Sequence, residues 1–234
     1  MASSLKPFPA EDWSEPLRDF MTRELKHLPT DWLVKRRVTL EPPSAKRLAA
    51  DLKKEKVARL DRSKRAHAIA AQAQDVTTGM FTLLRQRRAV PLKCPATSAL
   101  MSAANGDLLA VVFYFKTEFN AARPSAYEPD IRPMFAKPDP DFPGHPSYPS
   151  GHAAQSRIYA LVLAELFPKL RQELIAIADD IAYNREVAGV HFEADSDAGK
   201  SLADQVFKLL MDQPAFARLI PLARAEWPEC RDLR

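Results

Sequence analysis

The sequence predicts an all-α protein that folds as a single-domain helical bundle. Only 6 of its 234 residues are glycine and 46% are hydrophobic, a composition that suits helices packed around one core. No stretch shows the strict apolar–polar alternation of a half-buried strand, and no internal repeat is found. We expect residues 1–43 to form an N-terminal arm of the same domain and residues 44–234 to form the bundle.

Helical segments follow one another along the predicted bundle. Residues 44–88 are rich in Ala, Lys and Leu, which favours one long helix, with a break near residues 75–79 as the alternative. Proline is dense between residues 138 and 149, so an irregular loop is expected there. Further helices are predicted at residues 96–123, 151–167, 169–186, 191–211 and 214–226.

A first cluster of cationic residues lies at the end of the helix predicted for residues 96–123. Lys116 and Arg123 are about two helical turns apart, which would place both side chains on one stripe. Pro124 would end this helix, because it lacks an N–H group and disfavours helical geometry in the residue before it. The two cations can therefore converge on one anion, with Arg as a bidentate partner and Lys as a point charge.

The sequence Pro149-Ser150-Gly151-His152 predicts the start of a helix after the Pro-rich loop. Ser150 is a suitable N-cap residue. The first amides of the helix would point outward and favour an anion, and Gly151 would let the backbone approach that anion closely. His152 falls in the first turn, beside whatever anion binds.

A third cluster contains Arg185, His191 and Asp195, with Gly189 between the first two. Arg185 and His191 would lie about 120° apart on a continuous helix, so we place a break at Gly189. His191 and Asp195 are one helical turn apart on one face. Asp195 can therefore accept a hydrogen bond from one imidazole nitrogen, which fixes the tautomer and raises the basicity of the other nitrogen.

Together the clusters supply three fixed cations, two histidines and a carboxylate. This set suits a tetrahedral oxyanion, such as phosphate or vanadate, that is held without a divalent metal. No cluster of Asp, Glu and His has the spacing of a zinc or magnesium site, so no metal site is predicted.

The three clusters resemble, in order and spacing, the three motifs of the type 2 phosphatidic acid phosphatase superfamily. That superfamily also contains the soluble class A bacterial acid phosphatases and the vanadium-dependent haloperoxidases. The resemblance runs from Lys116 to Asp195, about a third of the chain. It implies an all-α bundle of the acid phosphatase/vanadium haloperoxidase type. One departure is Asn184 before Arg185, where the family usually has Ser.

The resemblance also implies roles for individual residues. His191 would be the nucleophile that forms a phosphohistidine, and Asp195 would orient it. His152 would be the general acid that protonates the leaving group. The oxyanion would be held by the remaining motif residues, which are Lys116, Arg123, Ser150, Gly151 and Arg185.

The function expected from this set is hydrolysis of small-molecule phosphomonoesters without a metal or another cofactor. The alternative is a vanadate-dependent haloperoxidase that uses the same pocket, with vanadate as cofactor and His191 as its axial ligand. Chain length favours the phosphatase. The sequence from His145 to Ala153 resembles the haloperoxidase branch, and this resemblance would place His145 near the oxyanion. As an ordinary loop residue, His145 would instead be solvent-exposed or a local cap. A non-catalytic anion-binding scaffold is a third class, but pure binding needs no oriented nucleophile.

Charge restricts the remaining partners. The net charge is +4, and much of the excess base lies between residues 46 and 65, where Asp51, Glu55 and Asp61 are interleaved. We interpret this segment as a solvated helix face and expect no nucleic-acid partner. The longest apolar run, residues 108–115, is far shorter than the roughly 18 residues that a membrane span needs, so no span is predicted.

Targeting signals and cysteines add two expectations. Residues 1–13 lack the apolar core of a signal peptide, so we expect a cytoplasmic protein, or a periplasmic or secreted one if a signal has been removed. Cys94 and Cys230 form no disulfide framework or zinc site and are expected to be free thiols. No feature of the sequence indicates the substrate or the oligomeric state.

Overall fold

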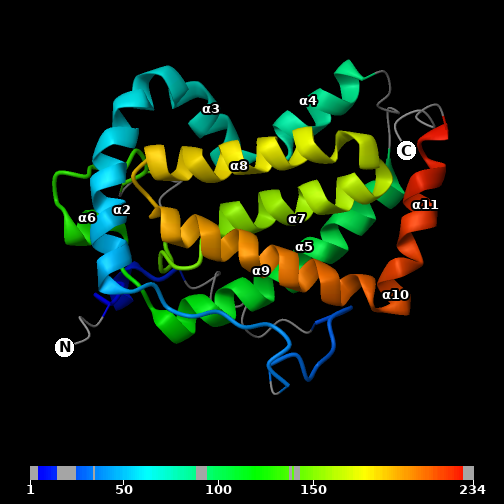
Figure 1. Cartoon of the computed structure of the whole chain (residues 1–234), viewed down its shortest axis with the longest axis horizontal. Helices are drawn as coiled ribbons and strands as arrows, with labels where there is room; N and C mark the ends of the chain where they lie inside the picture. The colour runs from blue at the N-terminus through cyan, green and yellow to red at the C-terminus, as the bar shows by residue number, and fades with distance from the viewer. Residues whose placement is uncertain are drawn as a thin grey trace.

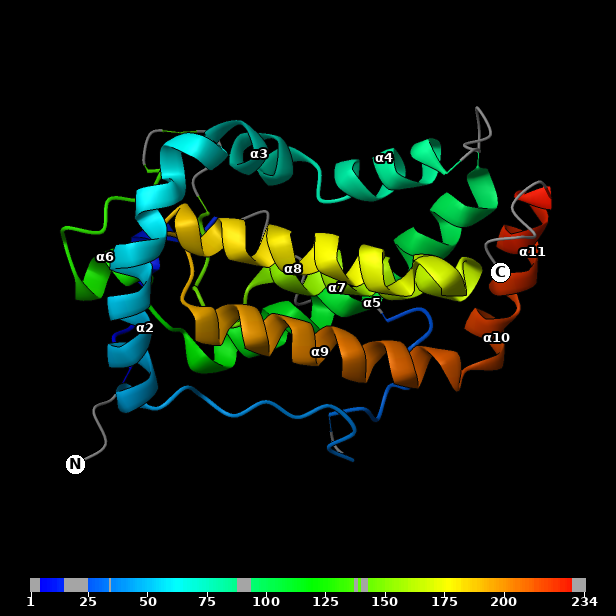
Figure 2. The ribbon, with the colours of Figure 1, turned by 45° about the horizontal axis from the view of Figure 1, so that its top comes forward.

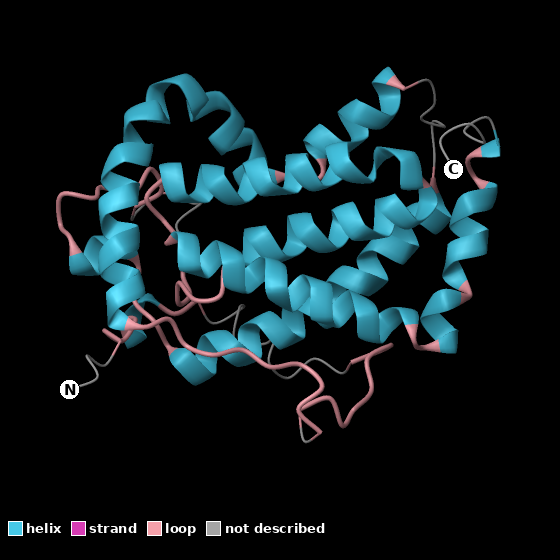
Figure 3. Cartoon of the chain, in the orientation of Figure 1, coloured by secondary structure: helices cyan, strands magenta, loops and turns pink. Residues whose placement is uncertain are grey.

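Helices are the only regular secondary structure in the part of the chain that the structure describes. This computed structural model describes residues 5–14, 25–33, 35–87, 94–136, 139 and 143–228. Figure 3 shows helices and loops and no strand in that part of the chain. The one pairing of extended backbone among the described residues is an isolated bridge between Pro7 and Ala121. The predicted all-α class is therefore confirmed.

Four long helices form the centre of the molecule: α5 (Pro95–Phe119), α7 (Gly151–Leu166), α8 (Arg171–Val187) and α9 (Glu193–Met211). α7 lies in the middle and packs against the other three (Figures 1 and 2). Their apolar side chains form one large core, which is the arrangement expected when each helix buries one apolar stripe. α7 and α9 begin, and α8 ends, at the same end of this bundle (Figure 1).

Shorter helices cover the two ends and one side of the bundle. α2 (Ala45–Ala58) crosses the end where α9 begins and contacts α8 and α9 (Figure 1). α3 (Arg62–Gln74) and α4 (Thr78–Gln86) run beside α8, and α6 (Pro124–Tyr127) is a single turn. α10 (Pro214–Ala217) and α11 (Leu219–Ala225) close the opposite end (Figure 2). The end covered by α2 is where the motif residues meet.

The segment predicted as one long helix is divided into three. The break near residues 75–79 is confirmed, since α3 ends at Gln74 and α4 begins at Thr78. A second break, the 3₁₀ turn Arg59–Asp61, was not predicted and turns the chain between α2 and α3. Arg88, the predicted end of this segment, lies outside the described residues, as does Cys230, while Cys94 is a free thiol.

The prediction that Lys116 and Arg123 share one helix is wrong. α5 ends at Phe119, because Asn120 adopts a left-handed conformation with φ 43°, which asparagine tolerates better than most residues. The Asn120 N–H closes the helix on the Lys116 carbonyl at 2.9 Å. Arg123 then stands in extended geometry as the N-cap residue of α6, with Pro124 as the first residue of that turn.

The other predicted helix bounds lie close to the observed ones, with two differences. The prediction for residues 191–211 placed His191 inside the helix, but α9 begins at Glu193 and Phe192 is its N-cap residue. The C-terminal helix predicted for residues 214–226 is split into α10 and α11 at Arg218. The interpretation of α2 as a solvated face is wrong for Asp51 and Glu55, which are 1% and 3% exposed.

One described helix, α5, is long and apolar enough by length and composition to cross a membrane, with a mean hydropathy of 1.3 over its best window. Half of that window is buried inside the structure, where α5 packs against α7, α9 and α11. The core helix of a soluble protein passes the same test, so this observation is weak evidence for a span. The sequence prediction counted only an uninterrupted apolar run and therefore did not single out this helix.

Candidate active site

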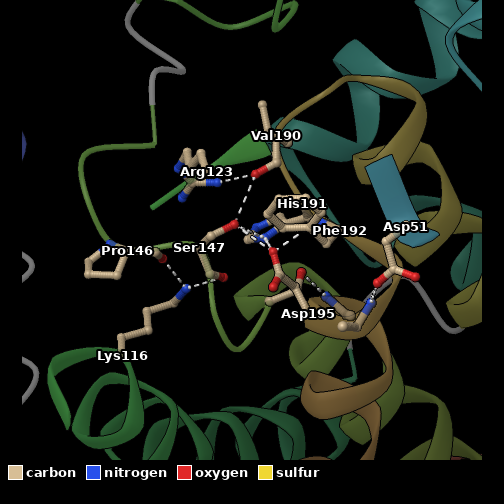
Figure 4. A network of polar contacts seen from close by, with 12 residues as sticks. Asp51, Lys116, Arg123, Pro146, Ser147, Val190, His191, Phe192 and Asp195 are labelled. Atoms are coloured by element: carbon tan, nitrogen blue, oxygen red, sulfur yellow. Dashed lines mark hydrogen bonds and ion pairs between the residues drawn. The ribbon is translucent and has the colours of Figure 1, made fainter. Parts of the chain in front are cut away.

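Lys116 is fully buried beneath the Pro-rich loop. It stands in the last turn of α5 and is 0% exposed. Its Nζ donates hydrogen bonds to the carbonyl oxygens of Pro146 at 2.6 Å and Ser147 at 3.1 Å (Figure 4). Burial, and then the charge of Arg123, hold the pKa of Lys116 well below its usual range. The ammonium group thus joins α5 to the loop that leads into α7.

Arg123 reaches the same place from outside α5. Its Nη1 donates to the Val190 carbonyl oxygen at 2.5 Å and its Nη2 donates to the His145 carbonyl oxygen at 2.9 Å. Its Nε is buried and has no hydrogen-bond partner in the described part of the chain. Burial lowers the pKa of Arg123 to about 9. Arg123 and His191 therefore come together through space, although the shared helix that was expected does not exist.

His145 is packed against Arg123 rather than exposed to solvent. Its Nδ1 lies 3.2 Å from Arg123 Nη2 and 3.0 Å from the Pro146 carbonyl oxygen. Its ring meets the Phe113 ring edge to face, with the centroids 5.4 Å apart. Burial and the charges of Lys116 and Arg123 lower its pKa. The imidazole is thus neutral and lies within the cationic cluster.

The start of α7 is fixed against α9. Ser150 is the N-cap residue, as predicted, and its Oγ accepts from the Ala153 N–H at 3.4 Å. The Ser150 N–H donates to the Asp195 carbonyl oxygen at 2.9 Å. Gly199 of α9 makes this approach possible, since a Cβ there would lie 2.4 Å from the Ser150 carbonyl oxygen. A Cβ at Gly151 would meet nothing within 4 Å, so there is open space beside the first amides of α7.

His152 occupies the first turn of α7. Its side chain is half-buried, and its Nε2 lies 3.3 Å from the Ala73 carbonyl oxygen of α3. Burial, followed by the charge of Arg185, lowers its pKa to about 3. The imidazole is therefore neutral near pH 7 in the free protein. A dianion bound beside it would favour its protonated form.

Arg185 and His191 lie on the two sides of the predicted break. Gly189 has a φ of +75°, a left-handed geometry that glycine adopts without steric cost. Arg185 is in the last turn of α8, 2% exposed, with its guanidinium 5.0 Å from the centroid of the Phe135 ring. His191 is 2% exposed and stands in the connection just before α9.

Asp195 holds one nitrogen of the His191 imidazole. His191 Nδ1 lies 3.1 Å from Asp195 Oδ2, which also accepts from the Phe192 N–H at 3.0 Å and from Ser147 Oγ at 2.5 Å (Figure 4). Because a carboxylate only accepts, Nδ1 carries the proton and Nε2 has the free lone pair. The predicted contact is therefore present, although His191 precedes α9 and Asp195 lies within its first turn.

Ser147 was not singled out from the sequence. Its carbonyl oxygen binds Lys116, and its Oγ lies 2.5 Å from Asp195 Oδ2 and 3.4 Å from His191 Nδ1. It is 0% exposed. Its place between Pro146 and Tyr148 in the loop gave no signal of these contacts. Gly199 was also missed, although a glycine inside a helical pattern is costly and can mark a close approach.

The electrostatic balance at His191 favours an anion. Burial, and then the charges of Arg123, Lys116 and Arg185, hold the pKa of His191 well below its usual range. Burial raises the pKa of Asp195, the carboxyl group within this cluster. Three cations thus act on one neutral imidazole and one carboxyl group. A bound oxyanion would reduce the cost of keeping these cations out of water.

A cavity of about 380 Å³ opens at His191 on the side of α2 and α8. His191 is the one member of the predicted set that lines it; its other walls are Asp51, Lys54, Glu55, Val57, Ala58, Tyr183, Glu186 and Glu193. In the described ranges, no group of three or more His, Cys, Asp and Glu residues could hold a metal ion. Asn184, the departure from the family motif, binds Arg65 Nη1 at 2.8 Å and Gln72 Oε1 at 2.7 Å.

Curated proteins that are similar to this chain in sequence include several acid phosphatases. The chain is 38% identical over 80 residues to a non-specific acid phosphatase of Salmonella typhi. These 80 residues are 34% of this chain and 32% of that protein. It is 29% identical over 85 residues to a non-specific acid phosphatase of Providencia stuartii, covering 36% of this chain and 34% of that protein. The matched stretch spans about a third of the length of these curated relatives.

A solved structure and a family match complete the comparison. The fold is similar to a structure described as the first bacterial vanadium-dependent iodoperoxidase, with a TM-score of 0.55, 19% identity, and coverage of 75% of this chain and 51% of that chain. This likeness establishes the type of fold. The PAP2 superfamily matches residues 95–213, just over half of the chain and the part that carries all three motifs. The chain therefore belongs to the PAP2 superfamily.

Proposed function

We propose that this protein hydrolyses phosphomonoesters through a phosphohistidine on His191, without a metal ion. The observation that carries the proposal is the buried His191–Asp195 pair, 3.1 Å apart, within reach of the charges of Lys116, Arg123 and Arg185. The acid phosphatases among its relatives support the same reaction class. A site built only to bind an anion would need the cations but not the oriented imidazole.

The first chemical step is an in-line displacement at phosphorus. The lone pair of His191 Nε2 attacks, a P–N bond forms, and the P–O bond to the leaving group breaks. His152 gives its proton to the departing oxygen, so an alcohol leaves. Asp195 keeps the proton on Nδ1 and stabilises the positive charge that the phosphorylated imidazole acquires.

The second step returns the enzyme to its starting state. A water oxygen attacks phosphorus, the P–N bond breaks, and His152 accepts a proton from the water, which becomes part of inorganic phosphate. His191 recovers its lone pair. Phosphate release then frees the site, so each turnover consumes one ester and one water.

The cationic residues would stabilise charge on the phosphoryl oxygens. Arg123 Nε is a buried donor without a hydrogen-bond partner among the described residues, and the open space beside Gly151 gives access to the first amides of α7. Ser150, Lys116 and Arg185 complete the surroundings of the anion. Since phosphoryl transfer depends mostly on positioning and electrostatics, losing one such donor typically lowers turnover by about 10²–10³.

The same residues also fit vanadate, which makes a haloperoxidase the second candidate. His191 would ligate vanadium, and Lys116, Arg123 and Arg185 would surround its oxygens. When bound, vanadate would supply peroxide activation for halide oxidation. The observation in favour is His145, whose Nδ1 lies 3.2 Å from Arg123 Nη2 and which has no role in the phosphatase steps.

Two assays on the purified full chain test this ranking. We expect hydrolysis of p-nitrophenyl phosphate that persists in EDTA and is inhibited by vanadate, and no turnover in His191→Ala. The vanadate-loaded protein should oxidise bromide and iodide poorly. Activity that is lost on chelation and restored by magnesium would refute the mechanism. Efficient halide oxidation without ester hydrolysis would make the haloperoxidase the function.

A further inference from the structure

Two carboxyl groups that form no ion pair within 4 Å among the described residues line the cavity beside His191. Glu55 of α2 is 3% exposed, and neither of its carboxyl oxygens has a hydrogen-bond partner in the described part of the chain. Glu186 of α8 lines the same cavity and is half-buried; Ser196 is a hydrogen-bond partner of its carboxyl group and the charge of Lys200 acts on it, but it forms no ion pair within 4 Å among the described residues. Burial of carboxyl groups that lack an ion-pair partner is unfavourable, so a cationic ligand would compensate for it.

The other two acids of the cavity wall are already neutralised. Asp51 is bound by Arg47 Nε at 2.9 Å and by the Ala194 N–H at 3.0 Å. Glu193 is hydrogen-bonded to Lys54 and lies 3.6 Å from Arg47 Nη2. The cations at the rim are therefore engaged with the rim acids, and the carboxyl groups of the cavity that remain without an ion pair are Glu55 and Glu186.

The charged groups that face Glu55 come from every neighbouring element. Three carboxyl groups act on it: Asp51 of α2, Glu186 of α8 and Asp195 of α9. Arg62 of α3 is the opposing cation; its Nε and Nη1 donate to the carbonyl oxygens of Val187 and Arg132, and its buried Nη2 has no hydrogen-bond partner in the described part of the chain. Burial and the three carboxyl groups raise the pKa of Glu55 to about 9, and burial raises the pKa of Glu186 to about 7. Both groups would ionise more readily beside an added cation.

The groups that line the cavity indicate which kind of cation could bind in it. None of the described carboxyl and imidazole groups form a cluster of three or more that could hold a metal ion. An organic ammonium needs only one or two carboxylates and an apolar wall for its methylene groups, which Val57, Ala58 and Tyr183 provide. The cavity of about 380 Å³ also has His191 in its wall, so a small molecule can place one end at the imidazole and the other at the carboxyl groups.

We propose that the substrates are phosphomonoesters of amino alcohols, with the phosphate at His191 and the primary ammonium group between Glu55 and Glu186. This inference rests on the proposed function, and it adds a substrate class to it. The oxyanion side of the site is cationic and the cavity side is acidic, so the two sides together match a zwitterionic ester. A phosphate ester of the same size with an uncharged alkyl chain would leave both carboxyl groups without a cationic partner at the end of that chain.

Binding of two non-hydrolysable phosphonates tests the proposal without requiring turnover. The probes are 2-aminoethylphosphonate and n-propylphosphonate, which have similar size and differ in the terminal ammonium. Calorimetry on the full chain should give an affinity ratio of at least about tenfold in favour of the amino compound, equivalent to about 1.4 kcal/mol. In Glu55→Gln and in Glu186→Gln this ratio should fall by at least about fivefold.

A carboxylate elsewhere on the same helix provides the matched control. Glu173 lies in the first turn of α8, 3.4 Å from Arg87 and away from the cavity. Glu173→Gln removes the same charge and should keep the ratio of the wild-type protein. If Glu55→Gln does not fold, the affinity ratios of the wild-type protein and of Glu186→Gln still test the ammonium site.

Different results would contradict the ammonium site and the phosphatase activity. A wild-type ratio near one, or an unchanged ratio in both cavity variants, would overturn the ammonium site even if p-nitrophenyl phosphate is hydrolysed. A ratio that falls equally in Glu173→Gln would also overturn it, because the effect would then be one of net charge. A strong cavity-dependent ratio with no ester hydrolysis would support the ammonium site and reject the phosphatase.

Discussion

Replacing Gly199 by alanine should separate α7 from α9, the two helices that position the proposed catalytic residues His152 and His191. The added Cβ would lie 2.4 Å from the Ser150 carbonyl oxygen and 3.1 Å from the Ala154 nitrogen, whereas ordinary contact begins at 3.4 Å. The obstructing atoms are backbone, so no side chain can rotate away. The start of α7 must therefore retreat from α9 by about 1 Å, weakening the bond from the Ser150 N–H to the Asp195 carbonyl oxygen.

Two opposing effects determine how much Gly199→Ala changes the free energy of unfolding. Alanine in a helix interior is favoured over glycine by about 1 kcal/mol, while overpacking costs about 1–3 kcal/mol. With backbone as the obstacle, we expect the upper part of that range and a net loss of about 1–2 kcal/mol. For a chain of this length this corresponds to a fall in Tm of about 2–8 °C. A 1 Å displacement of His152 from His191 can lower kcat/KM by about 10²-fold.

Thermal unfolding and hydrolysis of p-nitrophenyl phosphate measure the two effects. Gly106→Ala is the control, because Gly106 lies within α5 and a Cβ there would meet nothing within 4 Å. That variant should gain up to about 1 kcal/mol from helix propensity and retain activity. If Gly199→Ala unfolds at or above the wild-type temperature and hydrolyses the ester equally fast, the approach of α7 to α9 does not position the site.

Three further outcomes follow from the same contacts. His152→Ala should cost less on p-nitrophenyl phosphate than on alkyl phosphates, because a good leaving group needs no proton; equal losses in kcat/KM would contradict its role as general acid. His145→Ala should keep ester hydrolysis within about tenfold, and bromide oxidation that disappears in this variant would instead favour the haloperoxidase. Glu55 has a pKa of about 9 in the folded protein against 4.5 as its ordinary value. The folded state therefore binds more protons in this window and stability falls as pH rises. Chemical denaturation should show that wild type loses up to about 2.7 kcal/mol relative to Glu55→Gln between pH 6 and pH 8, and parallel pH profiles would show that Glu55 is already ionised.

The parts of the site that sequence predicted depend on local backbone chemistry. Ser150 caps α7 because its side chain accepts from the third amide of the helix, and Gly189 breaks the chain before His191 with a φ of +75°. Both features are properties of a few consecutive residues. The end of α5 was also local in origin, but the left-handed Asn120 was overlooked and the helix was extended to Arg123.

The parts that sequence did not predict depend on contacts between distant segments. Ser147 meets Asp195 only because the Pro-rich loop folds over the start of α9. Glu55 stands among Lys53, Lys54 and Lys56, a setting typical of a solvated helix face. Its burial results from α2 crossing the ends of α8 and α9, which no pattern within α2 encodes.

The residues proposed to act on phosphorus and the residues proposed to select the substrate lie in different parts of the chain. The family match covers residues 95–213, which include His191, His152 and the cations that would hold a phosphoryl group. α2 lies outside that match, yet it supplies Glu55 and much of the wall of the cavity at His191. The residues of the proposed oxyanion site lie on, or at the ends of, helices that share one core and cannot change independently. α2 crosses the end of the bundle and, in the proposed reaction, would face the leaving group, so substitutions there would alter which alcohol is accepted while the groups proposed to act on phosphorus stay in place.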